Sequence, residues 1–356
     1  MPYEPGKPVE EVQRELGLDR VVKLASNESP YGPFPVALEA LARAERELNR
    51  YPDAGGWKLR TALAERHGVR LDEVALGSGS DGIVDMLSQV ALVPGDEIVC
   101  AWPGFPSYGI YATKLGGVAR RIPLRDDRHD LDALADAVTE RTKLVYIANP
   151  NNPTGTMNTR AELDRYFDAV RGHVLTVLDE AYFEYVSDPD YPDGIEEYFK
   201  RGVRVAVLRT FSKIYGLAGL RIGYAVAPEE VVRELAKVRR AFDVSTPAQE
   251  AAVASLGDTA EIDTRRRLNT EGLVELDTAL RRHGLRTAAP SVANFVFAEV
   301  GDDARPLFDE LLRLGVIVRP AGGFGAPGAI RVSVGTPEEN ALFAEALGTV
   351  LATAWR

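Results

Sequence analysis

The stretch Val203-Arg-Val-Ala-Val-Leu-Arg-Thr-Phe-Ser-Lys213 joins an apolar run to hydroxyl side chains and a lysine. A short apolar run of this kind is typical of a strand buried on both faces of a parallel sheet. Ligands of such sheets bind beyond the carboxyl ends of the strands, where Lys213 stands. A lysine there can hold an aldehyde cofactor as a Schiff base. The stretch therefore predicts an α/β fold with a candidate catalytic lysine.

Similar apolar runs recur along the chain and alternate with helical patterns. This alternation indicates a mostly parallel central sheet flanked by helices, followed by a smaller α+β domain. We expect an N-terminal arm over residues 1–28 that packs with the small domain, a large domain over 29–246 and the small domain over 247–356. Strands of the large sheet are expected at residues 73–76, 97–101, 119–123, 143–148, 174–178 and 203–208, and strands of the small domain at 293–298, 316–319 and 329–334.

Composition excludes several classes of function. The 356 residues carry a formal net charge of −11, which argues against a general nucleic-acid binder. Clusters such as Arg265-Arg266-Arg267 are typical of solvated faces. The single cysteine cannot form an internal disulfide, and the four histidines show no metal-ligand spacing. No apolar run is long enough to span a membrane and no signal-peptide pattern is seen, so a cytoplasmic protein is expected.

Two motifs follow strand-like runs and place polar groups at strand ends. Gly77-Ser-Gly-Ser-Asp-Gly82 leads into a helix, and its glycines let backbone N–H groups approach an anion at the helix N-terminus. The alternative is an ordinary tight turn. Ala148-Asn-Pro-Asn-Asn-Pro-Thr-Gly155 has two X-Pro steps that hold adjacent amides in place. Asn152 is therefore a candidate partner for a cofactor's phenolic oxygen, unless the motif is only an Asx-turn.

A third strand ends in acidic residues, in Val174-Leu-Thr-Val-Leu-Asp-Glu-Ala-Tyr182. We expect Asp179 to be half-buried at the strand end, where a carboxylate can pair with a pyridinium nitrogen and keep the ring protonated. Tyr182 can donate to the cofactor oxygen. The alternatives for Asp179 are a helix N-cap and a structural ion pair.

The residues around Lys213 suit a phosphate. Thr210 and Ser212 supply two hydroxyl donors, and Arg221 supplies a charge-assisted fork. Partial desolvation and the nearby Arg221 would also lower the pKa of Lys213 and favour its neutral amine. A lone lysine after a strand is usually a surface residue, but here several phosphate- and ring-binding elements occur in a consistent order at strand ends.

Together these motifs resemble those of the fold-type I aminotransferases that depend on pyridoxal 5'-phosphate (PLP). The resemblance spans essentially the whole chain and is carried by Gly79-Ser-Asp81, Asn149-Pro-Asn-Asn-Pro-Thr-Gly155, Asp179-Glu-Ala-Tyr182, and Ser212-Lys213 with Arg221. Further stretches are similar to the histidinol-phosphate aminotransferases, namely Tyr3-Glu-Pro-Gly-Lys-Pro8, Leu24-Ala-Ser-Asn-Glu-Ser-Pro-Tyr-Gly32, Asn49-Arg-Tyr-Pro-Asp53, Arg209-Thr-Phe-Ser-Lys213 and Ile330-Arg-Val-Ser-Val-Gly-Thr336.

The resemblance implies an activity and a role for each matching residue. The reaction would convert L-histidinol phosphate and 2-oxoglutarate into imidazole-acetol phosphate and L-glutamate by a ping-pong mechanism, as a step of histidine biosynthesis. Lys213 would hold PLP and shuttle a proton. The protein would be a homodimer with shared active sites. The implied contacts are Asp179 on the ring nitrogen, Asn152 and Tyr182 on the phenolic oxygen, Phe105 on the ring face, Ser80, Asp81, Thr210, Ser212 and Arg221 on the phosphate, Tyr51 on the phosphate in the neighbouring subunit, and Tyr3, Asn27, Arg319 and Arg331 on the substrate.

The sequence also supports Arg331 independently of the resemblance. In Ile330-Arg-Val-Ser-Val334 the aliphatic residues take one face of a strand, and Arg331 takes the other with Ser333. A guanidinium there offers a fork for a carboxylate or a phosphate. The alternative is a solvent-facing strand arginine.

Other functions stay open on the same site. Trp102-Pro-Gly-Phe-Pro-Ser-Tyr-Gly-Ile-Tyr111 is rich in aromatic residues, which leaves aromatic amino acid transamination open. Threonine-phosphate decarboxylation is a further alternative with the same cofactor. A regulator built on this scaffold would need a basic helix-turn-helix, which the sequence lacks. A dinucleotide-binding enzyme would need G-x-G-x-x-G after its first strand, and none follows the strand expected at residues 21–24.

Overall fold

Seven strands form the central sheet of the computed structural model, which describes residues 7–354. All neighbouring strands run parallel except at the two ladders made by β8, which is antiparallel to β2 and β7. The predicted mostly parallel sheet is confirmed. In spatial order the strands are β2 (Val74–Gly77), β8 (Gly223–Val226), β7 (Val205–Thr210), β6 (Leu175–Asp179), β5 (Thr142–Ala148), β3 (Glu97–Trp102) and β4 (Val118–Pro123).

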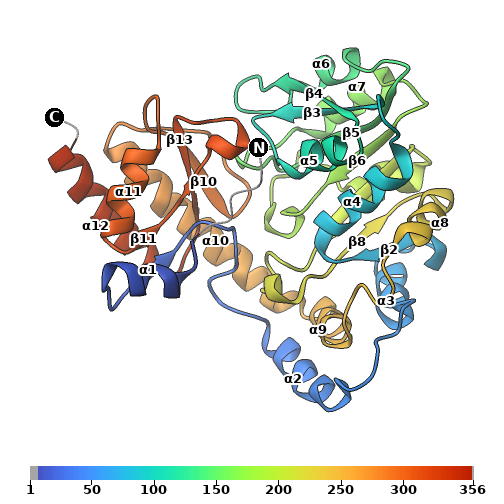
Figure 1. Ribbon diagram of the computed structural model, residues 1–356, viewed down its shortest axis with the longest axis horizontal. Helices are drawn as coiled ribbons and strands as arrows, with labels where there is room; N and C mark the ends of the chain where they lie inside the picture. Colours follow the sequence, from blue (N-terminus) through green and yellow to red (C-terminus); the bar gives the residue numbers. More distant parts are fainter. Residues whose placement is uncertain (1–6, 355–356) are drawn as a thin grey trace.

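Helices cover both faces of this sheet (Figure 1). One face packs on α4 (Gly79–Ala91), α5 (Ser107–Lys114) and α8 (Glu229–Val238). The other packs on α2 (Pro35–Ala44), α3 (Trp57–His67), α6 (Leu131–Asp136), α7 (Arg160–Ala169) and α9 (Thr246–Leu256).

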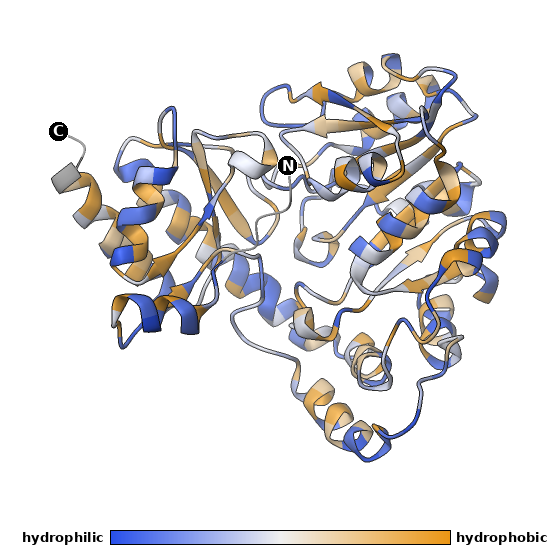
Figure 2. Cartoon of the chain, viewed as in Figure 1, coloured by the Kyte–Doolittle hydropathy of each residue, from blue (hydrophilic) through white to orange (hydrophobic). Residues whose placement is uncertain are grey.

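Along β7, Val205 and Val207 face one core whereas Ala206 and Leu208 face the other. Burial on both faces explains why the strands read as continuous apolar runs, and Figure 2 shows them as hydrophobic ribbons between helices with hydrophilic outer faces.

The smaller sheet lies beside the large one and is antiparallel, with the order β12-β13-β10-β9. Its strands are β9 (Arg286–Thr287), β10 (Phe295–Glu299), β12 (Arg319–Pro320) and β13 (Ala329–Ser333), and α11 (Arg305–Arg313) and α12 (Pro337–Ala354) cover it. The predicted strand at 316–319 is two strands, because β11 (Val316–Ile317) pairs with β1 (Val22–Lys23) while β12 pairs with β13.

Two of the elements that the sequence analysis missed matter for the site and the domains. β8 is four residues long and begins at a glycine, so its apolar run is too short to separate from the motif before it. α10 (Thr259–Arg282) is a helix of 24 residues that runs from the large sheet's side to the small domain (Figure 1). Ile262 packs in the core of the first and Leu280 in the core of the second.

The interpretation of the arginine cluster on α10 as a solvated face is wrong for Arg265. This side chain is buried, with 3% of its surface exposed, and it donates to the carbonyl oxygen of Gly32 at 2.5 Å and to that of Ile214 at 3.2 Å. Its ion pair with Glu261 is 2.8 Å long. Arg265 thus ties α10 to two loops of the large domain, which a charge count along the sequence does not reveal.

The domain boundaries stay a prediction, and the structure adds two observations. Val12 of α1 (Val9–Leu16) and Ala25 pack on Ile317, so the described part of the arm contacts the small domain. Helix α9, placed in the small domain by the prediction, packs on α2 and α3. Within residues 7–354, no helix combines the length and the apolar character that crossing a membrane requires.

Two buried histidines are expected to make stability sensitive to acid. Burial lowers the pKa of His67 to about 3 and that of His129 to about 4, against about 6.5 in an unfolded chain. Between about pH 6.5 and pH 4 the unfolded chain therefore binds protons that the folded chain does not, and the free energy of unfolding falls as the pH falls.

Urea unfolding at about pH 7.5 and about pH 5 measures this effect. We expect His129→Gln, whose amide can still donate to the Oδ1 of Asn151, to show a smaller loss on acidification than the parent. An equal loss in the two proteins would contradict the assignment.

Candidate active site

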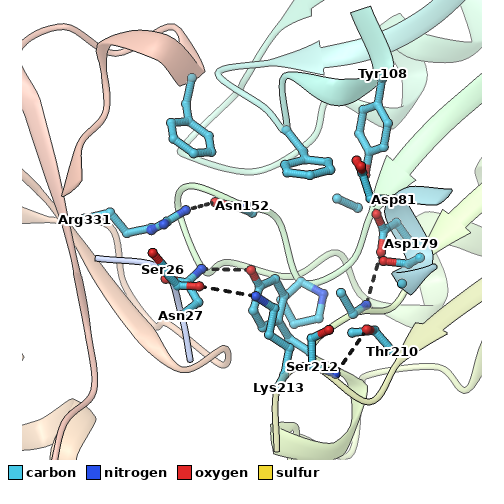
Figure 3. Close-up of a pocket in the computed structure, with 18 of the residues that line it drawn as sticks. Ser26, Asn27, Asp81, Tyr108, Asn152, Asp179, Thr210, Ser212, Lys213 and Arg331 are labelled. Carbon is cyan, nitrogen blue, oxygen red and sulfur yellow. Dashed lines mark hydrogen bonds between the residues drawn. The ribbon is translucent and has the colours of Figure 1, made fainter. Parts of the chain in front are cut away.

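One pocket collects most of the predicted site residues at the carboxyl ends of β5, β6 and β7 (Figure 3). Its walls come from both domains, because Arg331 of β13 and Asn27 face residues of the large sheet. The residues that line it are Ser26, Asn27, Gly79, Ser80, Asp81, Phe105, Tyr108, Ala148, Pro150, Asn152, Asp179, Ala181, Tyr182, Thr210, Ser212, Lys213, Arg221, Phe324 and Arg331.

Lys213 lies just beyond the end of β7 with its amine inside the pocket. Its Nζ is 3.5 Å from the carbonyl oxygen of Ser26 and 5.5 Å from the centre of the Tyr182 ring. Burial lowers the pKa of Lys213 to about 8, and the charges of Arg331 and then Arg221 act in the same direction. At pH 7.5 about a quarter of the amines are then neutral, against about one in a thousand for a free lysine. The amine is therefore prepared for nucleophilic chemistry.

Asp179 is the last residue of β6 and is fully buried, with 6% of its surface exposed, rather than half-buried as expected. The hydroxyl of Tyr108 donates to its Oδ2 at 2.7 Å, and the backbone N–H of Ala181 donates to its Oδ1 at 3.2 Å. Burial raises the pKa of Asp179, and these two hydrogen bonds oppose that rise. A carboxylate in such surroundings is suited to a cationic partner.

Backbone and side-chain donors converge at the N-terminus of α4. Arg221 donates from Nη1 to the hydroxyl of Ser212 at 3.4 Å and to the carbonyl oxygen of Ala218 at 3.1 Å. A Cβ on Gly223 would stand 2.5 Å from the backbone nitrogen of Ser80, so glycine permits the close approach of β8 to the helix start. Helix N–H groups, hydroxyls and a guanidinium together form a site for a phosphate.

Arg331 is held on the opposite side of the pocket. Its Nη1 donates to the Oδ1 of Asn152 at 2.5 Å and its Nη2 to the carbonyl oxygen of Ala25 at 2.7 Å. Only 4% of its surface is exposed, so the alternative of a solvent-facing strand arginine is wrong. Ile330 and Val332, its neighbours on β13, lie in the core as the alternation predicts.

Asn27 connects the two halves of the site. Its Nδ2 donates to the hydroxyl of Tyr182 at 2.8 Å, and its backbone N–H donates to the hydroxyl of Ser333 at 2.8 Å. Its φ of +55° is held by these bonds and by a third from Asn294 to its carbonyl oxygen. Asn27 therefore fixes Tyr182 beside Lys213.

Two predicted residues lie elsewhere, and a third is not described by the structure. Tyr51 is 81% exposed and stacks on Phe242 with the ring centres 4.4 Å apart, outside the pocket of its own chain. Arg319 is buried on β12, with its guanidinium carbon 5.4 Å from the centre of the Phe324 ring, and does not line the pocket. Tyr3 lies outside the described residues.

Two aromatic lining residues were missed by the sequence analysis. Tyr108 follows Phe105 by three residues, and its role depends on Asp179, which is 71 residues away in the chain. Phe324 stands in the glycine-rich loop after β12, and its carbonyl oxygen accepts from the backbone N–H of Gly104 at 3.1 Å. The aromatic stretch around Phe105 was the only sequence signal for the first, and no pattern marked the second.

The donor set fits the cofactor that the resemblance implies. Phosphate donors at α4, a buried carboxylate and a buried amine surround one cavity, and the Oδ1 of Asp81 is buried there without a hydrogen-bond partner. Within residues 7–354, no group of three or more histidine, cysteine or acidic side chains is placed to bind a metal ion. An anionic aldehyde with a basic ring nitrogen therefore suits these side chains better than a metal.

Comparisons with known proteins agree with this geometry. Residues 19–347 match the model of the family described as aminotransferase class I and II. The chain is 47% identical over 99% of its length to the histidinol-phosphate aminotransferase of Moorella thermoacetica, covering 91% of that protein, and 46% identical over 99% to histidinol-phosphate aminotransferase 2 of Pseudomonas fluorescens, covering 95%. The crystal structure of the Sinorhizobium meliloti histidinol-phosphate aminotransferase in complex with pyridoxal 5'-phosphate superimposes with a TM-score of 0.91 at 31% identity, covering 98% of this chain and 96% of that one.

The close approach at Gly223 can be tested with a matched pair of glycines. We expect Gly223→Ala to weaken binding of PLP by about tenfold or more, because the new methyl group would push Ser80 and Gly79 away from the phosphate site. Gly219→Ala is the control, since a Cβ there meets no atom within 4 Å. Equilibrium dialysis of PLP against each protein measures the effect, and equal affinities would count against this phosphate site.

Proposed function

The chain belongs to the class I and II aminotransferases, and from this premise we propose that it transfers the amino group of L-histidinol phosphate to 2-oxoglutarate with PLP as its cofactor. The products are imidazole-acetol phosphate and L-glutamate, a step of histidine biosynthesis in the cytoplasm. The observation that carries the proposal is the buried amine of Lys213 between an arginine and a carboxylate, Arg331 and Asp179. Curated relatives of 46–47% identity that carry this activity in their names support the choice of substrate.

The pocket residues divide into three groups around the cofactor. Asp179 would pair with the ring nitrogen, while Tyr182 and Asn152 would reach the phenolic oxygen and Phe105 would cover the ring face. When bound, PLP supplies an electron sink for negative charge at the carbon that bears the amino group. The residues that would hold its phosphate at the N-terminus of α4 are Ser80, Asp81, Thr210, Ser212 and Arg221.

Lys213 performs the proton transfers. Its lowered pKa leaves a useful fraction of neutral amine, the form that would hold the cofactor's aldehyde with loss of water. During the transfer, Lys213 would take a proton from the substrate carbon that bears the amino group and return one to the carbon of the former aldehyde, as general base and then general acid. Burial in the pocket keeps water from competing for this proton.

Arg331 binds the acidic group of each substrate in turn. A ping-pong reaction needs one pocket for a phosphate-bearing donor and a dicarboxylate acceptor, and a guanidinium fork accepts both anions. Asn152 and Ala25 fix the fork in place. We assign Asn27, Arg319 and Tyr3 to the substrate side as well, and their contribution stays a proposal.

The aromatic residues near the site give no support to an aromatic amino acid as the donor. The hydroxyls of Tyr108 and Tyr111 are bound to Asp179 and Asp81, at 2.7 and 2.6 Å. The guanidinium carbon of Arg121 lies over the Trp102 ring, 4.0 Å from the ring centre. These rings build the cofactor's surroundings, so their number does not indicate a pocket for an aromatic substrate.

We also propose a homodimer that shares its active sites. Tyr51 and Phe242 form an exposed aromatic pair, and Tyr51 is placed by the family resemblance at the phosphate of the neighbouring subunit. An exposed stacked pair on a monomer is explained if a second copy covers it.

A substrate panel tests the reaction. We expect the largest kcat/KM for histidinol phosphate with 2-oxoglutarate, lower values for phenylalanine by about tenfold or more, and no CO₂ release from threonine phosphate. Product analysis of each half-reaction measures all three. A larger kcat/KM for phenylalanine would replace the proposed function by aromatic amino acid transamination, and CO₂ release would replace it by decarboxylation.

Subunit mixing tests the shared site. We expect Tyr51→Ala and Lys213→Ala each to lose most activity alone, because one weakens phosphate binding and the other lacks the reacting amine. After unfolding and refolding an equal mixture, hybrid dimers contain one site with both lesions and one intact site, so about a quarter of the parent activity should return.

The control mixture combines Tyr51→Ala with Lys237→Ala, which removes an exposed ion pair on α8. Subunits that carry Lys237→Ala should keep the parent's activity. Absence of any gain in the Tyr51 and Lys213 mixture, in dimers shown to be hybrid, would contradict shared sites.

A further inference from the structure

We propose that Tyr108 is a positioning residue that fixes the carboxylate of Asp179 toward the cofactor's ring nitrogen and holds it in its ionised form. The proposal rests on the proposed function, in which Asp179 pairs with that nitrogen. It assigns to α5 a role in the chemistry beyond the stacking residue Phe105.

The hydrogen bonds at Asp179 set the plane of its carboxylate. Tyr108 donates to Oδ2 at 2.7 Å from α5, and Ala181 donates to Oδ1 at 3.2 Å from the loop after β6. Each oxygen thus has one protein donor and keeps further lone pairs for the pocket. Figure 3 shows the phenol of Tyr108 pointing toward the strand end that carries Asp179.

Tyr108 itself is locked in one position. Only 2% of its surface is exposed, and its ring stacks on that of Tyr146 with centres 4.3 Å apart and planes 9° apart. The ring of Phe105 meets it edge-on at 5.5 Å and 79°. A phenol clamped by two rings cannot rotate away from its acceptor, so its hydroxyl acts as a fixed donor.

The charges around Asp179 show why a donor is needed. Burial and the charge of Asp81 on α4 raise the pKa of Asp179, whereas the hydrogen bonds from Tyr108 and Ala181 and the charge of Lys213 lower it. Of the interactions that lower it, the bond from Tyr108 is the largest. Burial also raises the pKa of Tyr108 well above its usual value, so the proton of this pair stays on the phenol.

Tyr108 is the second residue of α5, and Phe105 stands three residues before it in the segment that leads into the helix. Phe105 lines the pocket where the cofactor's ring face is placed, and Tyr108 reaches the carboxylate under the ring nitrogen. A displacement of this segment would therefore move Phe105, which covers the ring face, together with Tyr108, which holds the carboxylate of Asp179.

The apo-protein allows a direct test. Carbon-13 NMR of aspartate-labelled apo-protein follows the carboxyl of Asp179, whose signal is identified by its loss in Asp179→Asn. We expect Tyr108→Phe to raise the titration midpoint by about one to two pH units, the effect of losing one hydrogen bond to a charged group. Tyr146→Phe, which keeps the stack and leaves the bond to Asp179, is the control and should keep the parent's midpoint. An unchanged midpoint in Tyr108→Phe overturns the proposal.

If Tyr108→Phe does not fold, a second variant tests the proposal. Site-specific 3-fluorotyrosine at position 108 makes the phenol a stronger donor and should lower the midpoint, and an unchanged or raised midpoint overturns the proposal. In the holoenzyme, nitrogen-15 NMR of labelled PLP should report loss of the ring-nitrogen proton in Tyr108→Phe, with binding weaker by about tenfold. The carboxyl titration needs neither cofactor nor substrate, so its outcome is separable from failure of the proposed function in the substrate panel.

Discussion

A lysine amine held in a pocket beside two guanidinium groups, the buried one of Arg331 and the exposed one of Arg221, is the constraint on which this site depends. Lys213 has to be out of water to be partly neutral, and Arg331 and Arg221 push its pKa in the same direction as burial does. Those cations need compensation of their own, which Asn152 and Ala25 give to Arg331 through oxygen acceptors. The charges of Glu28 and then Asp179 oppose the shift, so the pKa of the amine stays near the pH at which it can both lose and regain a proton.

The parallel sheet is what brings these groups together. β5, β6 and β7 end at one edge, and each continues into a polar residue or loop that faces the same cavity. β8 then returns antiparallel beside β7 and carries the chain from Arg221 past the N-terminus of α4. Gly223 makes that return close enough to set the guanidinium of Arg221 beside the start of the helix.

Much of the site could be predicted from the sequence because its residues follow apolar runs directly. Lys213, Asp179 and Asn152 were found in this way, since strand ends are visible in the chain and converge in space. Tyr108 could not be found so, because its importance comes from a bond across 71 residues and from burial that a helix pattern does not report. The same reasoning applies to Arg265 of α10. In the sequence it is one charge of a cluster, whereas in the structure it is buried and donates to three oxygen acceptors.

The pocket's dependence on two domains follows from where Arg331 is anchored. Its backbone belongs to the small sheet, yet one guanidinium nitrogen is bonded to Asn152 of the large domain. The loop that carries Phe324 is bonded to Gly104, and Arg286 is paired with Asp127 across the same boundary at 2.6 Å. In the proposed function, the guanidinium that Asn152 holds is also the group that binds the anionic substrate. The proposed substrate site and the boundary between the two domains therefore share one buried side chain.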